Sequence, residues 1–211
     1  MYKRQDLFNH RATPNVEMVD EDGEEEDEAQ MMTMQLKQDS EIVDGEPTEL
    51  FISYGGETSA DRFLVLFGFV DDFQKHCYSE LVFPDPTQEH QDLGCNDRLK
   101  MVFRCQDGAV AGPVYDCILY AVLHQVDQTE RDRFYQAHVK KDSELKSQIH
   151  TKYAAATDSI LLNHVEVKLS ELETLSERVK QVDPESDALE MIRKHNEFMT
   201  RVLTKVRSRL K

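Results

Sequence analysis

The sequence has few basic side chains for its length of 211 residues. It holds 25 lysines and arginines against 41 aspartates and glutamates, which gives a formal net charge of −16. The imbalance is concentrated in residues 1–57, where sixteen acidic and four basic side chains leave a net charge of −12. Because such a surface repels a phosphate backbone, we expect no nucleic-acid partner.

The sequence also lacks any apolar run long enough to span a bilayer, and its start lacks a secretory signal pattern. We therefore expect no membrane partner. We expect an intracellular protein in the cytoplasm or the nucleus, with a plastid as the alternative. The length suits one or two domains, and we expect a monomer.

Cysteine is scarce and scattered. Cys77, Cys95, Cys105 and Cys117 include no pair with the close spacing of a zinc knuckle, so we expect no metal site. Thiols are favoured over disulfides, as is usual in a reducing compartment. No histidine–cysteine or serine–histidine pairing indicates hydrolytic chemistry, and the dispersed histidines are expected mostly on helix surfaces.

The stretch ELFISYGG at residues 49–56 is the clearest candidate for chemistry. Residues 50–54 are typical of a short strand, and Gly55 and Gly56 permit the sharp turn that ends it. Tyr54 therefore lies at a strand end, where its hydroxyl could reach a site. A buried structural tyrosine is the alternative.

A second motif, DLFNHRATPN at residues 6–15, precedes this stretch. In this order the two motifs resemble the last part of a SET domain, the fold of protein lysine methyltransferases. There a D-x-x-N-H-x-x-x-P-N run is followed by E-(L/V)-F-I-S-Y-G and then by a Y-G-F-V run, matched here by residues 67–70. The resemblance is closest to the Rubisco large-subunit methyltransferase branch, in which an all-helical substrate-binding domain follows the SET core.

The resemblance implies transfer of a methyl group from S-adenosylmethionine to a protein side chain, usually a lysine. It implies that Tyr54 is the catalytic residue and that Asn9 and His10 line the donor site. Phe67 and Phe69 would form the substrate channel, with core packing as the alternative for both.

The sequence departs from the family in three respects. Phe67 stands where many relatives have tyrosine, and Arg11 stands where the family usually has serine. No Gly-x-Gly segment occurs, although the first half of a SET domain normally uses one to hold the donor. We interpret the chain as an N-terminally truncated copy of a longer enzyme, and we expect the fragment alone to be inactive.

Strands are predicted at residues 15–19 and 31–37, where apolar and polar side chains alternate. Between them an acidic loop at residues 20–30 is too rich in carboxylates to fold by itself. A calcium site is the alternative for this loop, but the spacing of its carboxylates lacks the EF-hand order. Residues 71–112 are irregular, and segments 81–83 and 99–105 suit either short strands or pieces of helix.

Residues 113–211 are predicted to be helical. Apolar side chains recur at helical spacing from Pro113 onward, Thr129 is a plausible cap for a second helix, and a long helix covers residues 145–182. A last helix is expected to begin at Asp183 and Pro184 and to end in a basic segment, residues 201–211. A solvated helix end is favoured there over a membrane or nucleic-acid face.

The predicted fold class is therefore α+β, with a C-terminal remnant of a β-rich SET core in residues 1–70. An irregular connection, 71–112, leads to a helical domain, 113–211, that would bind the protein substrate. The alternative function is a non-catalytic protein-binding scaffold with a degenerate SET remnant.

Overall fold

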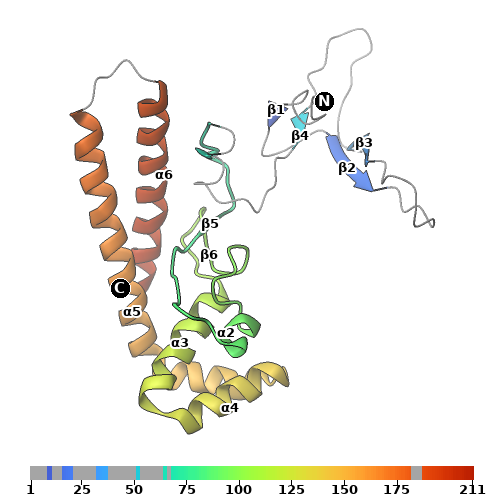
Figure 1. Ribbon diagram of the computed structural model, residues 1–211, viewed down its shortest axis with the longest axis vertical. Helices are drawn as coiled ribbons and strands as arrows, with labels where there is room; N and C mark the ends of the chain where they lie inside the picture. Colours follow the sequence, from blue (N-terminus) through green and yellow to red (C-terminus); the bar gives the residue numbers. More distant parts are fainter. Residues whose placement is uncertain are drawn as a thin grey trace. The chain divides into compact units, whose positions relative to one another are not determined.

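The computed structural model describes residues 9–10, 16–20, 32–37, 51–52, 64–65, 68–181 and 187–211. The chain divides into two compact units, Met1–Gly56 and Glu57–Lys211. The described residues are mostly helical with a few short strands (Figure 1), which is compatible with the expected α+β class. The predicted domain boundaries at residues 70 and 112 stay predictions.

The first unit holds two strand pairs. Strand β1 (Asn9–His10) runs parallel to β4 (Phe51–Ile52), and β2 (Val16–Asp20) runs antiparallel to β3 (Met32–Leu36). In the β2–β3 pair the register runs from Val16 opposite Leu36 to Asp20 opposite Met32. The two strands predicted from alternation are thus confirmed to within a residue or two at each end. The acidic loop beyond Asp20 lies outside the described residues.

Small elements that the sequence predicted only in part precede the long helices of the second unit. Strand β5 (His76–Tyr78) pairs antiparallel with β6 (Val102–Arg104), and the short helix α2 (Gln88–Asp92) lies between them. The segment at residues 99–105 therefore contains a strand. Residues 81–83 belong to neither a helix nor a strand.

Four long helices follow, named α3 (Gly112–Val126), α4 (Gln128–Val139), α5 (Ser143–Lys180) and α6 (Asp187–Leu210). Pro113 lies in the first turn of α3, as expected. The expected cap at Thr129 is wrong, because the Asp127 carboxylate accepts the Glu130 N–H at 2.9 Å and the helix begins at Gln128. Asp142 caps α5 in the same way, through the Leu145 N–H. The predicted start of the last helix at Asp183 lies outside the described residues.

One hydrophobic core joins these elements. Phe103 of β6, Phe134 of α4 and Phe198 of α6 are at most 2% exposed and belong to the same buried cluster. Helices α5 and α6 contact each other along the hairpin that they form (Figure 1), and α5 also contacts α3 and α4. The buried cluster thus connects strand β6 with helices that follow much later in the sequence.

The cysteine prediction is wrong for one pair. Cys95 and Cys117 form a disulfide with their Cα atoms 5.6 Å apart, a separation within the usual range. Both are buried, Cys95 just beyond α2 and Cys117 on α3. Cys77 and Cys105 are buried thiols, as expected.

Candidate functional site

The two motifs that carry the proposed chemistry form one pair of strands. Asn9 is in register with Phe51, and His10 is in register with Ile52. Neighbouring strands lie about 4.8 Å apart. The Asn-His run therefore lies beside the strand that leads, two residues further along the sequence, to Tyr54.

The other predicted site residues are placed unevenly. Tyr54 and Phe67 lie outside the described residues. Phe69 is described and half-buried, and it belongs to the unit Glu57–Lys211, whereas Asn9 and His10 belong to Met1–Gly56. The structure thus brings Asn9 and His10 next to the Phe51–Ile52 strand, and the predicted convergence with Tyr54 stays a prediction.

The second unit contains a buried carboxylate that the sequence reading did not single out. Asp116 of α3 is 4% exposed. Its Oδ2 accepts a hydrogen bond from Lys146 Nζ at 2.6 Å, and its Oδ1 accepts one from His150 Nε2 at 2.8 Å. His138 Nδ1 lies 4.0 Å from Oδ2. The carboxylate therefore links α3 to α5, with α4 close by.

These neighbours decide the charge of the cluster. Burial acts to raise the pKa of the Asp116 carboxyl, but the hydrogen bonds from His150 and Lys146 outweigh it. The pKa consequently lies below its ordinary value, and the carboxylate stays ionised at neutral pH. A pocket of about 510 Å³ adjoins the cluster, with Tyr115, Asp116, Lys146 and His150 in its lining.

The Asp116 cluster has the properties of a structural ion pair. Each carboxylate oxygen accepts a hydrogen bond from a side chain of α5, and these bonds join α5 to α3. Within the part of the chain that the structure describes, no group of histidine, cysteine, aspartate and glutamate side chains could hold a metal ion. We therefore assign the cluster to the stability of the helical unit.

Most of the dispersed histidines were expected on helix surfaces, and two of those on α5 are half-buried and bound within the unit. His150 binds Asp116, and His164 Nε2 donates to the Ser79 carbonyl oxygen at 2.7 Å. Burial lowers the pKa of His164, which favours its neutral form. The four-residue spacing of Lys146 and His150 places both on one face of α5, and this spacing was the signal available in the sequence.

The basic end of α6 is bound within its own unit. Lys205 Nζ donates to the carbonyl oxygens of Cys105 and Gln106, at 3.1 and 2.9 Å. Arg209 binds both the carbonyl oxygen and the carboxylate of Asp107. The expected solvated helix end therefore also serves to hold the turn that follows β6.

Among the helices in the described part of the chain, none combines the length and the apolar character needed to cross a membrane.

No protein-family model, no curated protein and no solved structure matches the chain.

Proposed function

We propose that this chain is the C-terminal part of an S-adenosylmethionine-dependent protein-lysine N-methyltransferase of the SET type. The observation that carries the proposal is the parallel pairing of Asn9–His10 with Phe51–Ile52. Two motifs that match the family in order along the sequence are also neighbours in space. If the two short motifs matched the family only by chance, they would not be expected to lie on paired strands.

The residues present supply part of a donor site. Asn9 and His10 would hold S-adenosylmethionine from β1, with Tyr54 approaching from the end of β4. The donor supplies an electrophilic methyl group on a cationic sulfonium. The Gly-x-Gly wall of such a site is missing from the sequence, so a complete donor site needs residues from another polypeptide segment.

The acceptor lysine sets the physical requirement for the site. A free lysine has a pKa of about 10.4, so presenting the neutral amine at pH 7 costs roughly 4–5 kcal/mol. A dry channel beside a cation lowers the amine pKa and reduces this cost. Tyr54, Phe67 and Phe69 are the aromatic side chains that we assign to the walls of this channel.

Alignment of the amine with the methyl group contributes further. Holding two reactants in the geometry of attack is worth on the order of 7–11 kcal/mol. In our proposal the phenol of Tyr54 orients the amine, and the helices α3–α6 hold the protein that carries it. The long α5–α6 hairpin supports this assignment, because its two helices offer an extended surface.

Substitution of the predicted catalytic tyrosine tests the proposal. We expect Tyr54→Phe to lower methyl transfer at least about tenfold with little loss of folding, since only a hydroxyl is removed. The protein is expressed with any coding sequence that precedes Met1 in its transcript. The assay measures the transfer of tritiated methyl groups from the donor to lysine-rich proteins. The matched control is Tyr120→Phe, which should transfer at the wild-type rate because this tyrosine is only 4% exposed.

Two outcomes would contradict the assignment. A wild-type rate of methyl transfer in Tyr54→Phe would show that the Tyr54 hydroxyl has no role in the reaction. If the wild-type protein neither transfers methyl groups nor binds the donor, the proposed methyltransferase function is wrong.

A non-catalytic binding scaffold is the second candidate. The absence of a Gly-x-Gly segment from all 211 residues favours it. Calorimetric titration with S-adenosylmethionine separates the two candidates. An active site binds the donor and gives a heat of binding, whereas a scaffold without a donor site gives none. Arg11 also favours the scaffold, since a cationic side chain is unfavourable beside a cationic donor.

A further inference from the structure

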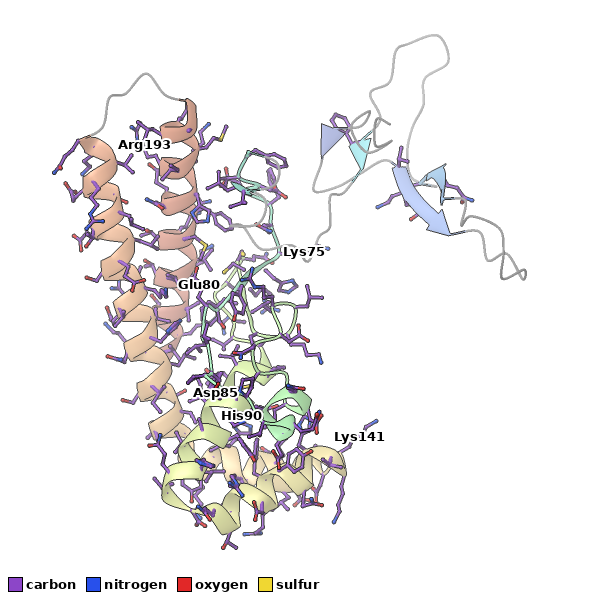
Figure 2. The ribbon with its side chains drawn as sticks, in the orientation of Figure 1. Lys75, Glu80, Asp85, His90, Lys141 and Arg193 are labelled. Carbon is purple, nitrogen blue, oxygen red and sulfur yellow. A yellow bond between two sulfur atoms is a disulfide. The ribbon has the colours of Figure 1, made fainter. Side chains whose placement is uncertain are left out.

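A short turn in the second unit is held in place by a histidine. Residues 84–90 lead from the segment after β5 into helix α2, and Figure 2 labels Asp85 and His90 within them. The Thr87 N–H donates to His90 Nδ1 at 3.2 Å, and Thr87 Oγ1 lies 2.9 Å from the same nitrogen. The N-cap residue of α2 is thereby joined to the third residue of the helix.

His90 stands where helices usually carry a different residue. In a capping box the third residue of a helix reaches back to the N–H of the N-cap residue, and this third residue is usually glutamate or glutamine. The oxygen of either side chain accepts a hydrogen bond at neutral and at mildly acidic pH. An imidazole nitrogen accepts only while it is unprotonated. The bond between Thr87 and His90 is therefore sensitive to protons in a pH range where the usual bond is not.

The donor determines which nitrogen of His90 carries the proton. A backbone N–H can only donate, so His90 Nδ1 is unprotonated and the neutral ring holds its proton on Nε2. The Thr87 hydroxyl could reverse its role and accept from a protonated ring, but the Thr87 N–H could not. Protonation of His90 therefore sets two N–H groups against each other across 3.2 Å.

The surroundings of His90 also oppose its protonation. Burial lowers the pKa of His90, and His124 of α3 and Arg131 of α4 lower it further, whereas the neighbouring Glu89 raises it. The pKa consequently lies below its ordinary value of 6.5. The stabilisation by neutral His90 is thus fully present above pH 6.5, and it is lost as the pH falls through the lower, folded-state value.

His90 covers a tyrosine of α3. The rings of His90 and Tyr120 meet edge to face with their centroids 4.9 Å apart, and Tyr120 is 4% exposed. The guanidinium carbon of Arg131 lies 5.8 Å from the centroid of the Tyr120 ring. The other polar and charged groups around this contact bind one another: Arg131 binds Asp132 and His124, and Asp92 accepts from Gln88 and Tyr135.

The turn is attached firmly on either side of this bond. On one side the Asn96 side chain binds both the N–H and the carbonyl oxygen of Phe83, each at 2.9 Å. On the other side Leu93 is 1% exposed and belongs to the hydrophobic core. The two prolines within the turn have no N–H to donate. The turn can therefore open between two fixed points when its bond to His90 is weakened.

We propose that His90 is a proton-sensitive latch, and that mild acid shifts the turn at residues 84–90 toward an open form in which Tyr120 is uncovered. The long helices stay packed, because the Asp116 carboxylate that joins α3 to α5 remains ionised in this pH range. The latch lies outside the motifs assigned to methyl transfer and does not depend on that assignment. It gives the helical unit a local change of surface in response to pH.

Amide hydrogen exchange of the whole chain, followed by nuclear magnetic resonance, tests the latch. The Gln91 N–H donates to the Thr87 carbonyl oxygen, so it loses protection when the turn opens. The matched reference is the Lys146 N–H, which donates to the carbonyl oxygen of Asp142, the N-cap residue of α5. Protection is the intrinsic exchange rate at each pH divided by the observed rate.

Between about pH 7.5 and about pH 5 the protection of Gln91 should fall about two- to tenfold, the effect of one lost hydrogen bond. The protection of Lys146 should stay the same. Unchanged protection of Gln91 would overturn the proposal. Equal losses at Gln91 and Lys146 would also overturn it, because they would show that acid destabilises the whole unit.

Two variants assign the effect to one side chain. His90→Gln supplies the usual residue of a capping box, which does not titrate, so the protection of Gln91 should be equal at the two pH values. His124→Gln on α3 is the matched control and should still show the fall. A fall that persists in His90→Gln, or one that disappears in His124→Gln, would refute the latch. Nitrogen resonances of the His90 ring at pH 7.5 should show the proton on Nε2, and a proton on Nδ1 would contradict the proposed bond.

Discussion

At the scale of single residues, Asp116 has the clearest energetic role among the described residues. Its carboxylate is buried. One oxygen accepts a hydrogen bond from Lys146 of α5, and the other accepts one from His150 of the same helix. A buried carboxylate without such donors is strongly unfavourable. Lys146 and His150 therefore make the burial of Asp116 tolerable and join α3 to α5 at the same time.

We expect Asp116→Asn to destabilise the helical unit by about 2 kcal/mol, the usual worth of hydrogen bonds to a charged group. The control is Asp132→Asn, whose carboxylate binds Arg131 but is largely exposed. An exposed pair of this kind is worth about 0–1 kcal/mol. Urea unfolding followed by circular dichroism measures both, since the sequence has no tryptophan to serve as a fluorescent probe.

The pH dependence of this difference follows from the pKa of Asp116. The folded-state pKa is lowered from the ordinary value of 3.8, so the stabilisation is fully present above pH 3.8. It is lost as the pH falls through the lower, folded-state value. The gap between the wild type and Asp116→Asn should therefore be present at pH 5 and shrink as the pH falls below 4. An unchanged gap at pH 3 would show that the penalty does not arise from charge.

Single residues were also where reading the sequence succeeded least. Thr129 and Asp127 are both good caps, and the sequence alone did not decide which one begins the helix. The partnership of Asp116 with His150 depends on how α3 packs on α5. The hydrogen bond from His164 to the Ser79 carbonyl oxygen joins residues 85 positions apart, so no local pattern could predict it.

At the scale of elements, the turn after β6 is shaped by its close approach to α6. Gly108 has a φ of +73°, and a Cβ atom added there would lie 2.5 Å from backbone atoms of Lys205 and Val206. The same turn is held by Lys205 and Arg209. Helix α6 therefore packs so closely against the turn after β6 that position 108 has no space for a side chain.

Gly68 offers a matched control for this contact, because its φ is +72° but open space surrounds it. Gly68→Ala should cost only the strain of the left-handed backbone, about 1–2 kcal/mol. Gly108→Ala should cost about 1–3 kcal/mol more, since the added methyl group must displace a helix backbone. Urea unfolding measures the two losses, and equal losses would show that the turn does not press against α6.

Elements with a clear period were predicted well. Alternation identified β2 and β3, and apolar spacing identified α3 and the long α5. Strand β5 escaped prediction, and the segment of β6 was left open between strand and helix, because each strand has only three residues, too few to establish a period. Their buried residues Cys77 and Phe103 are defined by the core that forms around them.

At the scale of the whole molecule, the chain consists of two units with different roles in our proposal. Met1–Gly56 carries the paired motifs that we assign to methyl transfer, and Glu57–Lys211 carries the helices that we assign to the protein substrate. The sequence predicted the coarse succession from strands to helices, because composition and periodicity change along the chain. The pairing of β1 with β4 was not predicted, since two-residue strands leave no periodic pattern.

The most direct test of the central claim is photo-labelling with S-adenosylmethionine that carries a tritiated methyl group. The labelled protein, with any coding sequence that precedes Met1, is digested, and the labelled peptides are identified by mass spectrometry. We expect the label in the peptides that contain Asn9 and His10 or Tyr54, because these residues are assigned to the donor. Label confined to helices α3–α6, or no label at all, would contradict the claim that the two motifs share a methyl-transfer site.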